Sequence, residues 1–394
     1  MHSSQSTESK LGQPDTAASH HSAAVAAFIR ERIDSAGGVL PFDEYMEAAL
    51  YAPGLGYYAA GSRKFGPGGD FVTAPELGPL FGQCLAREVG PVLASLKEAC
   101  VLEFGAGSGA LAVSLIEALS RLDQLPERYC ILEISPDLRE RQRKRLEPIA
   151  NQHGLDIEWL ERMPDAPLEG VILANEVVDA FPVTRFRVRN EKPVRAGVCI
   201  NGDGFAWDWI DDLGDDQSTM NIFCQYQLKE GYTSEVCHRS KAWMGALASA
   251  LQRGVVLVID YGFPAAEYYL PERSEGTLRC HYLHQAHNDP LIYPGIQDVT
   301  SHVNFSALAD AGRESGLEVL GYTSQEAYLL GLGLLELASP QPNDDEKQKV
   351  KTAAEVKGLI LPSQMGEAFK VMAFGKQADK PLQGFKLRDR SGSL

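Results

Sequence analysis

The sequence predicts an α/β protein whose main domain is a largely parallel sheet with helices on both faces. Three observations lead to this fold class. The chain has 394 residues, of which 44% are hydrophobic, so it can bury a large core. Short apolar runs alternate with helical stretches from residue 100 to residue 175, and strands in that rhythm pair in parallel. A turn with three glycines follows the first apolar run, where a strand would pass into its crossover helix.

The N-terminal part of the chain predicts helices and one long loop. Residues 1–21 are polar and predict a disordered leader, without the charged segment and apolar core of a secretory signal. Ser22 is expected to cap a first helix, and a second covers residues 42–50. Residues 53–75 are so rich in glycine and aromatic side chains that they predict a loop that packs against something. With a further helix near residues 76–96, these elements form a helical and lid segment over residues 22–98.

The alternation of strand and helix occupies residues 99–182. The apolar runs are CVLEF, YCILEIS, IEWL and VILAN, and helices are expected from Gly109 to Leu122 and from Pro136 to Leu146. This stretch predicts the Rossmann-like core.

The alternation of strand and helix ends after Phe181. The rest of the chain is predicted to contain the remaining core strands with insertions around them. Residues 183–253 contain VTRFRVRN, VRAGVCI and GFAWDWI, which predict an inserted segment of antiparallel strands. GVVLVIDYG then resumes the core, and residues 254–375 supply its remainder, including a helix near residues 305–315 and the strands LEVLGYT and FKVMAFG. The run SPQPNDDEKQK predicts a mobile loop, and residues 376–394 predict a polar, frayed tail.

Composition narrows the classes of partner and compartment. Lys and Arg number 37 against 53 Asp and Glu, and the net charge of −16 disfavours nucleic acid as a partner. The seven cysteines are scattered without a CxxC pair, which favours a reducing compartment. Apolar runs stay far below the ~20 residues that span a bilayer. We therefore expect a cytoplasmic protein with no membrane span.

The strongest local motif is VLEFGAGSGA at residues 101–110. Gly105, Gly107 and Gly109 let the main chain approach a ligand and leave amide groups of the helix N-terminus free to bind it. Glu103 lies inside the strand, where a carboxylate needs a polar partner. Glu133 ends the next strand, where nucleotide-binding folds place a carboxylate on ribose hydroxyls. The same glycines also satisfy the NAD fingerprint, so a dinucleotide site remains an alternative.

A second motif, ANEVVDAFPV, lies at the carboxyl end of the fourth parallel strand. Asn175 and Glu176 would face the same crevice as the glycine turn, because ligands of open α/β sheets bind at that edge. A helix N-terminal acid is the structural alternative for Glu176.

Segments spread over residues 40–375 carry a resemblance to a known family: EYMEAALYAPGLGYY, GDFVTAPELGPLFGQ, LEFGAGSG, YCILEISPDLRERQR, ANEVVDAFPVTRF, VIDYGF, GTLRCHYLHQAHNDPL, PGIQDVTSHVNFSAL and GLGLLE. GDFVTAPE and NEVVDAFPV are specific, whereas the glycine turn alone is not. Together they resemble the MidA-like family of class I S-adenosylmethionine (SAM)-dependent methyltransferases, whose mitochondrial members are arginine methyltransferases that assist respiratory complex I assembly.

The resemblance implies a Rossmann-like class I methyltransferase sheet with an N-terminal helical lid and an inserted substrate lobe. It implies SAM as cofactor and, as methyl acceptor, an arginine of a protein partner such as a respiratory complex subunit. Residues 57–71 would close over SAM and shape the acceptor channel.

The resemblance also implies roles for the residues singled out above. Gly105, Gly107 and Gly109 would let the main chain pass close to the methionine part of SAM. Glu133 would accept hydrogen bonds from the ribose, and Glu103 would hold the loop or the ammonium group. Asn175 and Thr73 are expected as further cofactor contacts.

An arginine acceptor needs carboxylates, because its guanidinium stays protonated with a pKa above ~12. Glu176 and Asp179 are the candidates to orient it, and a structural role or a SAM contact remains the alternative for both.

Other classes remain open from the sequence. An NAD-dependent oxidoreductase is the second enzyme hypothesis, and a non-catalytic assembly factor that retains a SAM site is the third. Cys280, His281, His284 and His287 lack the spacing of a zinc site, so no metal is expected. The basic run at residues 139–145 predicts a solvated helix face.

Overall fold

The structure is a computed structural model, and it describes residues 11–60, 73–211, 213, 216–342, 345–378 and 381–394. Residues 61–72 of the expected lid loop lie outside the described residues.

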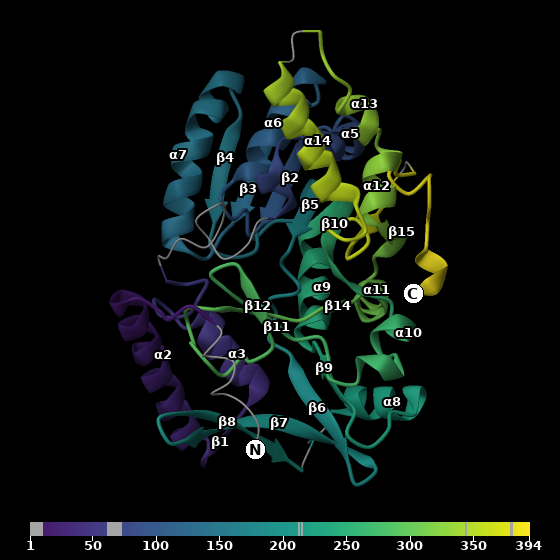
Figure 1. The fold of residues 1–394 in the computed structure, drawn as a ribbon. Helices are drawn as coiled ribbons and strands as arrows, with labels where there is room; N and C mark the ends of the chain where they lie inside the picture. Colours follow the sequence, from purple (N-terminus) through teal and green to yellow (C-terminus); the bar gives the residue numbers. More distant parts are fainter. Residues whose placement is uncertain (1–10, 61–72, 212, 214–215, 343–344, 379–380) are drawn as a thin grey trace.

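The centre of the molecule is an eight-stranded sheet (Figure 1). In spatial order the strands are β15 (Glu318–Ser324), β16 (Phe369–Lys376), β10 (Leu251–Phe263), β5 (Leu168–Asn175), β2 (Ala99–Phe104), β3 (Arg128–Leu132) and β4 (Asp156–Leu160), with β14 (Val303–Asn304) on the end of β10. The five strands from β10 to β4 are parallel, as predicted, and β16 is antiparallel to both of its neighbours. Strands β2, β5 and β10 are near-continuous apolar runs because both faces of the sheet are covered.

Two sets of helices cover the sheet. One face carries α5 (Leu80–Leu93), α6 (Ala110–Arg121) and α7 (Pro136–His153), and the other carries α9 (Arg239–Ala250) and α11 (Phe305–Glu314). Leu111, Leu115 and Leu119 recur every fourth residue along α6, so one stripe of that helix is buried against the sheet. The chain runs outward from β2 through β3 to β4 and then returns to β5 on the other side of β2. The strand order therefore reverses between β2 and β5, which is where open α/β sheets bind ligands.

The antiparallel strands expected after residue 183 form a second sheet. Its order is β1 (Val39–Pro41), β7 (Lys192–Asn201), β6 (Thr184–Arg189) and β9 (Thr233–Val236), with β8 (Gly204–Ile210) paired to β7. Figure 1 places this sheet at the end of the molecule opposite α6 and α14 (Glu346–Ile360). Helices α2 (Thr16–Ser35) and α3 (Phe42–Tyr51) pack on it, and the Phe42 ring lies 4.9 Å from the Trp207 ring.

Smaller elements complete the described chain. A third sheet has the order β12 (Gln285–His287), β11 (Arg279–Tyr282) and β13 (Asp298–Thr300). The other helices are α4 (Ala74–Leu77), α8 (Gln217–Tyr226), α10 (Ala265–Tyr268), α12 (Gln325–Gly331), α13 (Leu334–Leu337) and the 3-10 turns η1 (Pro271–Arg273) and η2 (Ser391–Ser393). Within these described ranges, no helix combines the length and the apolar composition needed to cross a membrane.

Three boundary predictions were wrong. Helix α2 begins at Thr16, within the predicted leader, because the Asp15 side chain accepts a hydrogen bond from the Ala18 amide at 2.8 Å. The helix expected at residues 76–96 is divided at Gly78 and Pro79 into α4 and α5. Part of the predicted mobile loop is the first turn of α14, which Asp345 caps through the Gln348 amide.

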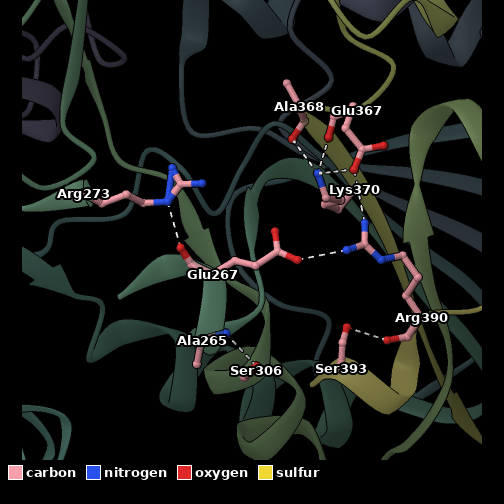
Figure 2. Close-up of polar contacts among 9 residues, drawn as sticks. All are labelled: Ala265, Glu267, Arg273, Ser306, Glu367, Ala368, Lys370, Arg390 and Ser393. Carbon is pink, nitrogen blue, oxygen red and sulfur yellow. Dashed lines mark hydrogen bonds and ion pairs between the residues drawn. The ribbon is translucent and has the colours of Figure 1, made fainter. Parts of the chain in front are cut away.

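The C-terminal tail is packed, so the prediction of a frayed tail was also wrong. The Glu88 carboxylate accepts hydrogen bonds from the amides of Gln383 and Gly384, both at 2.7 Å. Arg390 forms ion pairs with Glu267 at 2.9 Å and with Glu367 at 3.2 Å (Figure 2). A polar composition suggested disorder, but these bonds use the polar groups to fix the tail.

Candidate active site

A cavity of about 770 Å³ lies at the carboxyl edge of the main sheet, beside the switch between β2 and β5. It is lined by residues from nearly every part of the chain, from Tyr51 to Phe369. All but one of the predicted site residues line it: Thr73, Glu103, Gly105, Gly107, Glu133, Asn175, Glu176 and Asp179. Gly109 is the exception among them.

The glycine turn connects β2 to α6, as the sequence predicted. Gly105, Gly107 and Gly109 have φ angles of 57°, 55° and 80°, in the left-handed region that side chains with a Cβ disfavour. Gly109 is the residue before α6, and a Cβ there would meet the side chains of Gln142, Arg145 and Leu146 of α7. These contacts would be of ordinary van der Waals length, so the left-handed backbone before α6 is what favours glycine at position 109, whereas Gly105 and Gly107 line the cavity.

Glu133 is held by its neighbours in one orientation. Its carboxylate accepts hydrogen bonds from the Ser135 amide at 2.9 Å and from the Gln142 side chain at 3.1 Å. The same Gln142 nitrogen donates to the Gly107 carbonyl at 2.9 Å, so it ties the glycine turn to this carboxylate. Gln142 is fully buried on α7. Sequence reasoning missed it, although its place two turns after the cap Ser135 puts it on the same face of α7 as the cap.

The basic run on α7 is mostly a solvated face, as predicted. Arg139, Arg141 and Lys144 pair with carboxylates near them on the surface. Arg145 differs from these residues, because it donates a hydrogen bond to the Ser108 side chain at 2.9 Å. This bond links α7 to the glycine turn.

Glu103 is buried inside β2 and has the polar partner that its position requires. Tyr129 donates a hydrogen bond to it at 2.6 Å. Burial raises the pKa of Glu103 to about 7, and the nearby charge of Glu133 contributes to the rise, while the Tyr129 bond opposes it.

Glu176 directly follows β5 and has a strained conformation. Its φ angle is 54°, which is uncommon for a residue other than glycine and clusters at functional sites. Its amide donates to the Ile259 carbonyl at 2.9 Å, and the Asp260 carboxylate accepts from the next three amides, those of residues 177–179. The described chain from Glu176 to the start of β6 contains no helix, which removes the explanation of Glu176 as a helix-terminal acid.

The acidic residues at this end of the cavity have raised pKa values. Burial and the charge of Asp179 raise the pKa of Glu176 to about 8. Burial raises the pKa of Asp179 to about 6, and a hydrogen bond from Tyr261 opposes that rise. Asp298, on β13, also lines the cavity, and Tyr58 donates to it at 2.9 Å. The sequence did not single out Tyr261 or Asp298, because they come from strands far away in the chain.

The histidines noted in the sequence lie on β11, on β12 and in the turn between these strands. His281 lines the cavity, whereas His284 lies in the turn between β11 and β12 with a φ angle of 62°. Among the described residues, no group of three His, Cys, Asp or Glu side chains is arranged to hold a metal.

The comparison with protein families decides the identity. Residues 84–323 match the family described as "Putative S-adenosyl-L-methionine-dependent methyltransferase". The chain belongs to this methyltransferase family.

Relatives and solved structures agree with this assignment. The chain is 27% identical over 383 residues to the mitochondrial protein arginine methyltransferase NDUFAF7 homolog of Drosophila melanogaster, covering 89% of this chain and 84% of the relative. It is 28% identical to the zebrafish (Danio rerio) protein arginine methyltransferase NDUFAF7, covering 85% of this chain and 83% of the relative. A crystal structure from Burkholderia thailandensis, bound to S-adenosyl-homocysteine, is 41% identical with a TM-score of 0.93 and covers 98% of this chain and 100% of that one.

These findings make the methyltransferase a class I enzyme with SAM as its cofactor, and they replace the NAD hypothesis. The cavity suits that cofactor for two reasons. Gly105 and Gly107 line it without side chains, and Glu133 presents a carboxylate whose orientation is fixed by hydrogen bonds.

Replacing Glu133 with alanine is expected to weaken SAM binding by ~1–3 kcal/mol, through the loss of charged hydrogen bonds to the ribose. Calorimetry measures the affinity, and circular dichroism checks that the variant is folded. The control is Glu161→Ala, since Glu161 follows the neighbouring strand β4 and pairs with Arg139 outside the cavity. An unchanged affinity in a folded Glu133→Ala protein would place the ribose contact elsewhere.

The contribution of Glu176 to stability without cofactor should be lost as the pH rises from about 4.5 to about 8. Glu176 has a pKa near 8 when folded and an ordinary value of 4.5, so between these values the folded protein binds a proton that the unfolded chain lacks. Glu176→Gln should therefore match the wild type at pH 4.5 and exceed its unfolding free energy by on the order of 1–3 kcal/mol at pH 9. Urea unfolding at several pH values measures the difference, and a constant gap would refute the assignment.

Proposed function

We propose that this methyltransferase transfers the methyl group of SAM to an arginine of a protein partner. The observation that carries the proposal is the acidic end of the cavity, where Glu176, Asp179 and Asp298 lie together. Asn175 Oδ1 and Asp179 Oδ1 are buried and have no hydrogen-bond partner among the described residues. Unpaired acceptors and carboxylates suit a donor-rich cation, and a guanidinium has five N–H donors and no acceptor.

The reaction assigns these residues two tasks. The bound cofactor supplies a methyl group on a positively charged sulfur, which keeps the bonding electron pair when the methyl leaves. Glu176 and Asp179 orient the guanidinium and draw its charge away from the attacking nitrogen. The nitrogen that gains the methyl loses a proton. The positive charge of a guanidinium beside Glu176 lowers the pKa of this carboxyl group from its value of about 8, and the resulting carboxylate can accept that proton.

The relatives support the arginine acceptor. The Drosophila and zebrafish proteins are named protein arginine methyltransferases, and the similarity covers most of both chains. A respiratory complex subunit as partner, and a cytoplasmic location, are further parts of the proposal, and they rest on the resemblance and the composition.

Mass spectrometry of cells with and without this protein tests the proposal. We expect peptides with methylated arginine that disappear when the gene is deleted and return with the wild type but not with Glu176→Gln. The purified enzyme should methylate the same peptide in the presence of SAM. Methylation confined to lysine or to a small molecule would refute the arginine acceptor, and binding of a partner without methyl transfer would favour the assembly factor.

A further inference from the structure

Two consecutive residues of β10 hold one residue of the turn after β5. Asp260 accepts a hydrogen bond from the Asp179 amide at 3.2 Å, and Tyr261 donates its hydroxyl to Asp179 Oδ2. Successive side chains of a strand point to opposite faces, so the two residues reach Asp179 from different sides. One fixes its main chain and the other fixes its carboxylate.

The surroundings leave little freedom to either partner. The Tyr261 ring meets the His302 ring edge-on at 5.3 Å and the Phe369 ring edge-on at 5.4 Å. The Asp179 carbonyl accepts a hydrogen bond from the Ser301 amide at 2.9 Å. The segment that carries His302 thus holds the ring of Tyr261 and the main chain of Asp179 together.

This arrangement gives the two carboxylate oxygens different tasks. Tyr261 occupies Oδ2, and Oδ1 is buried without a partner among the described residues, on a side chain that lines the cavity. We infer that Tyr261 is a positioning residue, which keeps Asp179 ionised and in the rotamer that offers Oδ1 to the methyl acceptor. The inference deepens the proposed function and rests on it for the identity of the acceptor.

The charges around Asp179 explain why a donor is needed there. The titratable groups that interact with it or with its partners include Glu176, Asp260, Asp298, Tyr51, Tyr58, Arg239 and His302. Three are carboxyl groups, which disfavour a further negative charge, and burial acts in the same direction. A phenol that donates to the carboxylate opposes both effects, and it lowers the pKa of Asp179 relative to an otherwise identical site.

Tyr261→Phe tests the inference, because it removes the hydroxyl and keeps the ring. We expect kcat for methylation at pH 7 to fall tenfold or more, the acidic limb of the pH profile to move upward, and the affinity for SAM to change less than twofold. The control is Tyr322→Phe, since the Tyr322 hydroxyl is buried without a partner among the described residues and lies outside the cavity. An unshifted pH profile with normal kcat would overturn the inference.

A second measurement does not depend on the acceptor. Carbon-13 NMR of labelled aspartate side chains follows the titration of Asp179, with Asp179→Asn supplying the assignment. The pKa of Asp179 should rise in Tyr261→Phe and stay at its wild-type value in Tyr322→Phe, and an unchanged value in Tyr261→Phe would overturn the inference. If the wild type shows this Tyr261 dependence but methylates no arginine, the proposed function fails and the positioning role stands.

A second variant tests the inference if Tyr261→Phe does not fold. It keeps both the ring and the hydroxyl at position 261. A difluorotyrosine incorporated at position 261 is a stronger donor than tyrosine. It should lower the pKa of Asp179 and move the acidic limb of the profile downward, opposite to the effect of phenylalanine. A shift in the same direction as for phenylalanine, or none, would overturn the inference.

Discussion

Glu176→Gln is expected to reduce methylation of the acceptor a hundredfold or more and to leave SAM affinity near the wild-type value. The substitution keeps the size of the side chain and removes the carboxylate that forms beside the bound guanidinium and orients it. One electrostatic stabiliser of a transition state contributes about 3 kcal/mol, which is the basis of the estimate. Because the interaction strengthens in the transition state, the loss should appear in kcat more than in binding. Steady-state kinetics with the acceptor peptide and calorimetry with SAM measure the two quantities.

The matched control for Glu176→Gln is Glu158→Gln on β4, which removes a carboxylate outside the cavity. Glutamine retains the left-handed backbone at position 176, so the strain at the turn is the same in both proteins. Normal methylation by Glu176→Gln would reduce Glu176 to a structural residue. A collapse of SAM binding would instead place it on the cofactor, and Asp298 would become the next candidate for orienting the acceptor.

Gly107→Val is expected to abolish SAM binding at micromolar concentrations. Valine at a φ angle of 55° is strained, and its branched side chain would occupy the part of the cavity that the cofactor needs. Thermal unfolding with and without SAM reads out the effect, because a ligand that binds the folded state raises the melting temperature.

Backbone strain alone could weaken the Gly107→Val protein, so the control carries the same strain elsewhere. Gly202, in the turn between β7 and β8, has a φ angle of 57° and open space around its Cβ position. Gly202→Val should lower the melting temperature and still respond to SAM. A Gly107→Val protein that retains the SAM response would show that the cofactor does not pass over this turn.

The sequence predicted the parallel core and the glycine turn because both have local signatures. Apolar runs such as CVLEF and VILAN mark buried strands, and glycines at the end of such a run mark a sharp turn. Glu133 and Glu176 could be proposed because each ends a strand, and parallel strands end at the same edge of the sheet.

What the sequence did not predict depends on contacts between distant segments. Tyr261 and Asp298 reach the acidic turn from β10 and β13, and no local pattern marks either residue as a partner of Asp179 or Glu176. The tail was predicted to fray because its composition is polar, yet Glu88 and Glu267 hold it from positions more than one hundred residues away. The division of the chain into units at residues 98, 182 and 253 stays a prediction.

The position of β16 has a consequence for the synthesis of the chain. This strand is the last in the sequence, yet it lies between β10 and β15 in the sheet. Roughly a hundred residues separate the end of β10 from the start of β16, which at ~5–20 residues per second corresponds to a delay of about 5–20 s on the ribosome. Throughout that interval the hydrophobic edge of β10 has no strand to pair with, and open edges of this kind promote aggregation. Nascent chains are therefore most exposed to aggregation late in translation, and any chain that stops before Phe369 lacks the strand that covers this edge.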